Sequence, residues 1–203
     1  AAAVQQALQA AFGDWRQPAA GALGYTRVPQ PLVAVPPRRF VEITPDKANA
    51  NLQGGLSLPI SDRHPDHAAL SLANYIFGLG GNSRLWTRIR ETEGLSYDVR
   101  SMLGWSSTDD NTPWTVTAIF APGNQPKVEA ALKEELARSL KNGFTQQELD
   151  QGRAGLLNFR RLSRAQDAAV AGALAQNLYL GRTFAFSQQV DDAMAKLTLD
   201  ELN

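Results

Sequence analysis

The chain has 203 residues and no net charge, because 20 Lys and Arg are balanced by 20 Asp and Glu. This balance argues against nucleic-acid binding, which depends on excess positive charge. No apolar run approaches the roughly 18 residues of a membrane helix. The sequence has no cysteine, which excludes disulfides and thiolate metal sites.

The first 38 residues predict a helix followed by a linker. Val4, Leu8 and Phe12 recur at a spacing of four, which is typical of an amphipathic helix. We therefore assign residues 1–16 to the tail helix of a preceding domain. Residues 17–38 predict a semi-extended linker, because they lack periodicity and contain five prolines and two glycines: Pro18, Pro29, Pro31, Pro36, Pro37, Gly21 and Gly24.

Residues 39–203 predict one domain in which strands come first. Two strands are expected at 39–43 and 48–60, and Gly54–Gly55 in the second indicates a bulge or a close backbone approach. A buried helix follows over 66–79. The alternation at 95–105 and 114–120 then predicts a hairpin.

Helices are predicted over the rest of the chain, at 126–142, 145–162, 165–180 and 184–197. Capping boxes at Thr145–Glu148 and Thr198–Glu201 mark two helix starts. We expect the domain to be truncated soon after the second. Early strands and late helices predict an α+β fold, a largely antiparallel sheet with helices packed on one face.

The segment 78–100 carries the most information. Asn82 or Ser83 is placed to cap a helix that ends at Gly94, and a strand follows at once. Arg90 should therefore lie in the last helical turn, close to Tyr97 on the returning strand. Strict alternation would place Tyr97 on the same face as Val99 and Ser101.

The stretch GGNSRLWTRIRETEGLSYDV resembles the insulinase/pitrilysin family of zinc metallopeptidases, also called inverzincins, and the likeness runs over essentially the whole chain. The segments ANYIFGLGGNSRL, FTQQELDQGRAGLL and LYLGRTF are also similar to family stretches. The resemblance implies a processing-peptidase-like domain in a protein whose two halves face a chamber. One half binds zinc, and the other holds the peptide through R-x-x-x-G-L-x-Y, here Arg90, Gly94, Leu95 and Tyr97.

The zinc motif of that family, His-x-x-Glu-His, is absent. The two histidines, His64 and His67, are three apart and enclose Pro65 and Asp66, so we expect them to be solvated residues at a helix start. We therefore expect no metal site and no catalytic residue in this fragment, which should be inert alone. Zinc is expected in the complementary half, on the same chain or on a partner subunit.

The resemblance implies that Arg90 and Tyr97 bind substrate and assist the transition state. The glycine loop is expected to let the chain turn sharply, and its residues Gly80, Gly81 and Asn82 are candidates for contact with the peptide. The structural alternatives are an arginine that satisfies the last carbonyls of a helix and a half-buried strand tyrosine. Trp86 is expected in the core. A cluster of four arginines on the late helices is expected to be a solvated face: Arg153, Arg160, Arg161 and Arg164.

These observations predict the substrate-binding, non-zinc half of a zinc metalloendopeptidase that hydrolyses peptides. The alternative is a scaffold or partner domain of a catalytically inactive family member. Expected partners are a peptide and the zinc-bearing half, with no nucleic acid and no membrane span. Bacterial relatives are often exported, so the resemblance favours the periplasm.

Overall fold

The computed structural model describes residues 2–16 and 26–203. Residue contacts divide the chain into two units, which separate between Gln30 and Pro31. The first unit contains α1 (Ala2–Phe12), which buries none of its residues. Of the predicted linker, 17–25 lies outside the described residues, including Pro18, Gly21 and Gly24, and 26–38 has no regular secondary structure. No described helix is long and apolar enough to cross a membrane.

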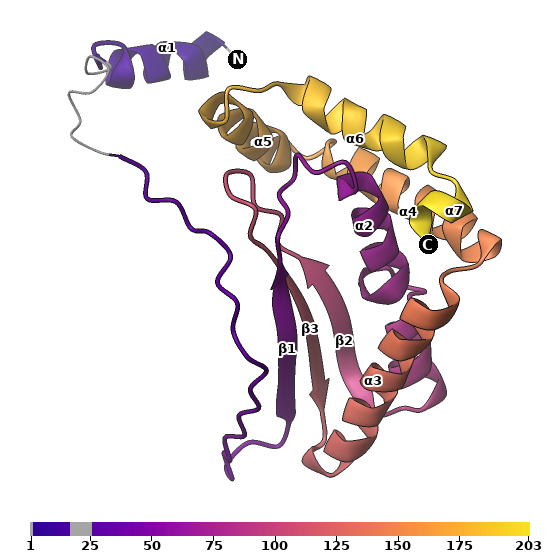
Figure 1. The fold of residues 1–203 in the computed structure, drawn as a ribbon. Coiled ribbons are helices and arrows are strands. Elements are labelled where there is room, and N and C mark those ends of the chain that lie inside the picture. The colour runs from indigo at the N-terminus through magenta and orange to yellow at the C-terminus, as the bar shows by residue number, and fades with distance from the viewer. Residues whose placement is uncertain (1, 17–25) are drawn as a thin grey trace. The chain divides into compact units, whose positions relative to one another are not determined.

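The second unit is built on a three-stranded antiparallel sheet in the order β1–β3–β2 (Figure 1). The strands are β1 (Ala50–Leu58), β2 (Ser96–Leu103) and β3 (Thr112–Phe120). β2 and β3 form the predicted hairpin. β1 pairs with β3 along its whole length. The central strand therefore has partners on both sides, while β1 and β2 are edge strands.

The strand expected at 39–43 is wrong. These residues are exposed and irregular, and β1 pairs only with β3 among the described residues. The apolar alternation gave this segment strand propensity, but a strand also needs hydrogen bonds from a partner.

The glycine pair in β1 makes no bulge, because the β1–β3 register runs without a break. A Cβ on Gly55 would lie 2.3 Å from the Trp114 carbonyl oxygen. Of the two predicted explanations, a bulge or a close backbone approach, the close approach is therefore correct at Gly55.

The helices follow the predicted order and cover one face of the sheet, which confirms the α+β class (Figure 1). Two of them contain π-helical turns, in which the backbone hydrogen bonds run from i to i+5. After β1 come α2 (His67–Asn74), η1 (Tyr75–Leu79) and η2 (Trp86–Thr92). After β3 come η3 (Pro122–Asn124), α3 (Gln125–Asn142), α4 (Gln146–Ser163), α5 (Asp167–Tyr179), α6 (Phe184–Lys196) and α7 (Leu199–Leu202).

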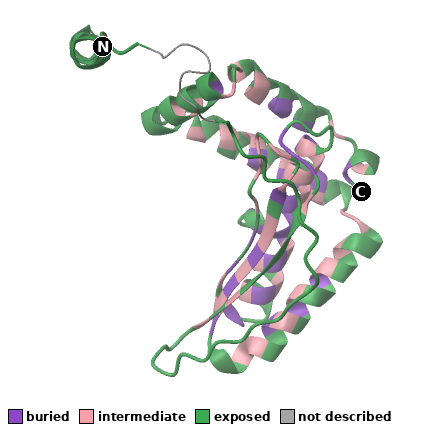
Figure 2. Ribbon diagram, turned by 60° about the vertical axis from the view of Figure 1, so that its left-hand side comes forward, coloured by how far each residue is buried: buried purple, intermediate pink, exposed green. Residues whose placement is uncertain are grey.

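Two apolar clusters hold the second unit together. One joins the sheet to η2 and α3 through residues such as Ile89, Val99 and Val128. The other joins α2, α4, α6 and α7 around Leu72 and Leu149. Figure 2 shows buried residues along the sheet and on helix faces turned toward it.

The apolar residues of α3 are not all part of the core. Leu140, near the C-terminal end of the helix, is exposed. The buried positions of α3 are Val128, Ala131 and Glu135.

Candidate functional site

The helix that carries Arg90 is wound more widely than the predicted α-helix. In η2, the Glu93 amide donates to the Arg88 carbonyl 3.0 Å away. Side chains five apart also meet, since Trp86 Nε1 donates to Glu91 (3.2 Å) and Arg88 Nε donates to Glu93 (2.9 Å). π-helical turns of this kind occur frequently at functional sites.

The helical segment 84–92, which contains η2, separates three groups of side chains. Leu85 and Ile89 are fully buried in the core. Arg84 bonds to α3, the α3–α4 turn and α4, and Arg88 bonds to α3. Arg90 lies over the ring of Trp86, with its guanidinium carbon 4.2 Å from the ring centroid. Trp86 is half-buried and lies outside both core clusters, so its expected core position is wrong.

The chain leaves η2 through Gly94, whose φ of +61° is the left-handed conformation expected there. β2 then begins with a bulge. Ser96 pairs with Phe120 and Asp98 pairs with Ile119, so Tyr97 is an additional residue in the strand. The Ser96 hydroxyl lies 2.6 Å and 2.7 Å from the carbonyl oxygens of Asp98 and Ile119, which stabilises the bulge.

The bulge corrects the expected orientation of Tyr97. Its side chain is 74% exposed, whereas Val99 and Ser101 are fully buried, so it does not share their face. A bulge interrupts the alternation of period two and re-aims one side chain. The sequence contained no local signal for this irregularity.

The structure brings Arg90 and Tyr97 together. Arg90 Nη1 donates to the backbone carbonyl of Tyr97 (2.8 Å), and its guanidinium carbon lies 5.4 Å from the tyrosine ring centroid. Arg90 therefore bonds to the returning strand, in contrast to the alternative in which it caps its own helix. Trp86, Arg90 and Tyr97 form one cationic–aromatic group, which we call the Arg90 cluster.

The glycine loop is not part of this cluster. Gly81 and Asn82 are exposed and Gly80 packs on Tyr75, all before the start of η2. Arg90 lies near the end of the helical segment that begins at Arg84. The two predicted contact regions thus lie at different places, the loop before this helical segment and Arg90 near its end.

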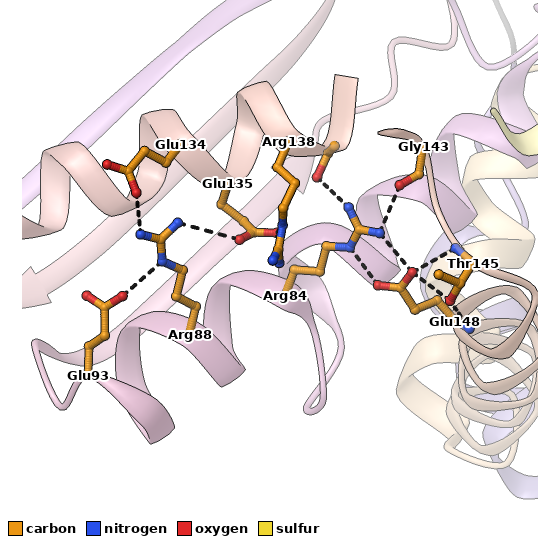
Figure 3. Close-up of polar contacts among 10 residues, drawn as sticks. Arg84, Arg88, Glu93, Glu134, Glu135, Arg138, Gly143, Thr145 and Glu148 are labelled. Atoms are coloured by element: carbon orange, nitrogen blue, oxygen red, sulfur yellow. Dashed lines mark hydrogen bonds and ion pairs between the residues drawn. The ribbon is translucent and has the colours of Figure 1, made fainter. Parts of the chain in front are cut away.

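An ionic network on the other side of η2 was missed by sequence reasoning (Figure 3). Arg88 contacts Glu93 (2.9 Å), Glu134 (2.5 Å) and Glu135 (3.7 Å). These contacts raise the pKa of Arg88, chiefly through its hydrogen bond to Glu134. Glu135 is fully buried and also accepts two hydrogen bonds from Arg138.

Arg84 extends this network to α4. It forms a two-pronged contact with Glu148, at 2.6 Å from Nε and 2.8 Å from Nη2. The hydrogen bond from Arg84 is the main reason that the pKa of Glu148 falls to about 2. These bonds therefore join the helical segment that carries the Arg90 cluster to α3 and α4.

The histidine pair does not fit zinc. His64 Nδ1 accepts a hydrogen bond from the Asp66 amide (3.2 Å). His67 packs between Trp105 and Phe186, with ring centroids 4.3 Å and 6.1 Å away, so the expectation that it is solvated is wrong. Burial is the main reason that the pKa of His67 is lowered. Within residues 2–16 and 26–203, no three His, Asp or Glu side chains are arranged to hold a metal ion.

The arginines of α4 and its C-cap, Arg164, contact neighbouring groups instead of forming a purely solvated face. Arg160 and Arg164 both pair with Asp191 on α6. Arg153 donates to the Leu197 carbonyl (2.5 Å). Arg161 donates to Asn158 (2.9 Å) and stays exposed. Three of the four therefore fasten α4 to α6 and its end.

Comparison with known proteins identifies the family to which this fold belongs. A family model described as the peptidase M16 inactive domain matches residues 1–156. The non-peptidase homolog YmxG from Helicobacter pylori is 28% identical over 165 residues, which cover 78% of this chain and 36% of the relative.

Solved structures agree with this match. The peptidase M16 inactive domain from Pseudomonas fluorescens has a TM-score of 0.66 at 25% identity, covering 77% of this chain and 37% of that one. An inactive peptidase domain from Bordetella parapertussis has a TM-score of 0.64 at 23% identity, covering 80% and 86%. The chain thus spans about a third of the first two relatives. It belongs to the peptidase M16 inactive-domain family, as the R-x-x-x-G-L-x-Y resemblance predicted.

Proposed function

We propose that this chain is the substrate-binding, non-zinc half of a zinc metalloendopeptidase. In this proposal a complementary half binds zinc, and the two halves enclose a peptide. The main support is the contact between Arg90 and Tyr97, which a π-helical turn and a bulge present together at the surface. The separate Gly80–Asn82 loop would contact another part of the peptide.

Each residue of the pair has a role suited to its chemistry. Arg90 offers N–H donors that orient the peptide. The exposed phenol of Tyr97 donates a hydrogen bond to the substrate carbonyl or to the oxyanion that develops from it. Zinc in the complementary half would supply an activated water for hydrolysis. This chain contributes binding and orientation.

The test is the Tyr97→Phe substitution in the complete protein. Loss of one transition-state hydrogen bond should lower kcat by roughly ten- to a thousandfold and change KM less. Tyr179→Phe is a matched control, because both tyrosines are 74% exposed. Kinetics of Tyr97→Phe that match this control would remove Tyr97 from the mechanism.

A second candidate function is a scaffold or partner domain in a catalytically inactive protein. The name of the Helicobacter pylori relative, a non-peptidase homolog, favours it. Arg90 would then serve packing alone. The two candidates separate on the zinc content and peptidase activity of the complete protein, and on whether its remaining sequence contains His-x-x-Glu-His. A periplasmic location is a further proposal, which cell fractionation tests.

A further inference from the structure

Arg90 differs from the other half-buried arginines of the described chain. Each of the others has a carboxylate within ion-pair distance: Arg84 with Glu148, Arg88 with Glu93, Arg153 with Asp150, Arg160 with Asp191 and Arg182 with Asp62. Among described residues, Arg90 has aromatic neighbours and one backbone carbonyl instead. Its charge therefore lacks the compensation that the fold provides elsewhere.

The acids closest in sequence to this cluster have other partners. Glu91 accepts the hydrogen bond from the Trp86 indole. Asp98 accepts two hydrogen bonds from Arg100, at 3.0 Å and 3.1 Å. An arginine that is partly removed from water and has no acid partner favours an incoming anion, because desolvating a lone charge is costly.

The hydrogen-bonding capacity of Arg90 indicates which anion fits. A guanidinium has five N–H donors, and the structure shows one bond, from Nη1 to the Tyr97 carbonyl. The contacts with the Trp86 and Tyr97 rings stabilise the cation without supplying an oxygen acceptor. The donors that remain suit a planar acceptor with two oxygens.

We propose that Arg90 binds a carboxylate of the peptide, either its C-terminus or an acidic side chain, and that Trp86 positions the guanidinium for this contact. The inference rests on the proposed peptide-binding function and narrows its ligand class. A backbone carbonyl would accept from Arg90 but leave its charge uncompensated. A carboxylate accepts two hydrogen bonds and neutralises the charge.

The experiment measures binding of three fluorescein-labelled pentapeptides to the complete protein by anisotropy. The first ends in a free carboxylate, the second is its C-terminal amide, and the third is the amide with one internal glutamate. The carboxylate peptide should bind about ten- to a hundredfold more tightly than the plain amide, as charged hydrogen bonds imply. Recovery of affinity by the third peptide would assign the site to acidic side chains, and its failure to recover would assign the site to the C-terminus.

Variants separate this inference from the proposed function. Arg90→Lys keeps the positive charge but loses the planar pair of N–H donors that binds both carboxylate oxygens. It should therefore abolish discrimination between the carboxylate peptide and its amide. Trp86→Leu should reduce discrimination and Trp86→Phe should restore most of it, whereas Arg161→Lys, on an exposed α4 position, should change nothing. If the peptides bind equally and Arg90→Lys weakens both, the carboxylate inference is overturned and peptide binding stands. If no probe binds, or if Arg90→Lys affects none, both fail.

Discussion

Replacing Glu148 with glutamine would isolate the ion pair that joins η2 to α4. Glu148 receives two hydrogen bonds from Arg84 and also closes the capping box of α4. Glutamine keeps one carbonyl oxygen for the cap, but it is uncharged and turns an amide donor toward a guanidinium donor. The substitution therefore removes the charge pairing while the size of the side chain is unchanged.

The lowered pKa of Glu148 sets the magnitude of the stability loss expected from this substitution. A fall from 4.5 to about 2 corresponds to an upper bound of about 3 kcal/mol of folding free energy. The Glu148 side chain is 26% exposed and Arg84 is 11% exposed, so solvent screens part of this interaction. We expect Glu148→Gln to lower the free energy of unfolding by about 2 kcal/mol at pH 7.

The lowered pKa of Glu148 also fixes the direction in which its contribution to stability changes with pH. Above pH 4.5 the carboxylate is ionised in both states, and its full contribution is present. As the pH falls from 4.5 toward 2, the unfolded state takes up a proton first, so the contribution is lost. Urea unfolding at several pH values should show the wild type and Glu148→Gln converging over this window.

Glu201→Gln is the matched control. Glu201 closes an identical capping box at Thr198, with the same contacts of 2.8 Å and 2.9 Å, but no arginine of the described chain bonds to it. It should cost clearly less than Glu148→Gln. Equal effects of the two substitutions, or a Glu148 effect that does not change with pH, would refute the ion-pair explanation.

Three other predictions concern stability and use urea or thermal unfolding. Leu72→Ala should cost about 3–5 kcal/mol, because this side chain is fully buried, whereas Leu140→Ala should be nearly neutral since Leu140 is exposed. Gly78→Ala should destabilise strongly, because its Cβ would lie 2.5 Å from the Ser101 Cβ, whereas Gly172→Ala, with open space in α5, should stabilise by about 0.5–1 kcal/mol. Because burial lowers the pKa of His67 below 6.5, the unfolded state takes up a proton first, and stability should fall as the pH drops below about 6.5. His67→Phe should flatten this dependence of stability on pH. A dependence that persists in His67→Phe would contradict the role of His67.

Local patterns account for the parts of the fold that the sequence predicted correctly. Both capping boxes form, and Gly94, which was expected to end a helix, has a φ of +61°. The hairpin and the helix order also follow from near neighbours in the chain. These features depend on interactions within a few residues, which a single sequence displays directly.

The sequence by itself therefore determined most of the elements, their order and the nearness of Arg90 to Tyr97, while the tertiary structure decided how that pair is presented. The π-helical turn and the bulge depend on packing of η2 against α3 and on pairing of β2 with β3. Arg84 and Glu148 are 64 residues apart, so no local pattern indicates their contact. The segment 39–43 had the alternation of a strand but pairs with no strand of the described chain, because pairing requires hydrogen bonds that a distant part of the chain must provide.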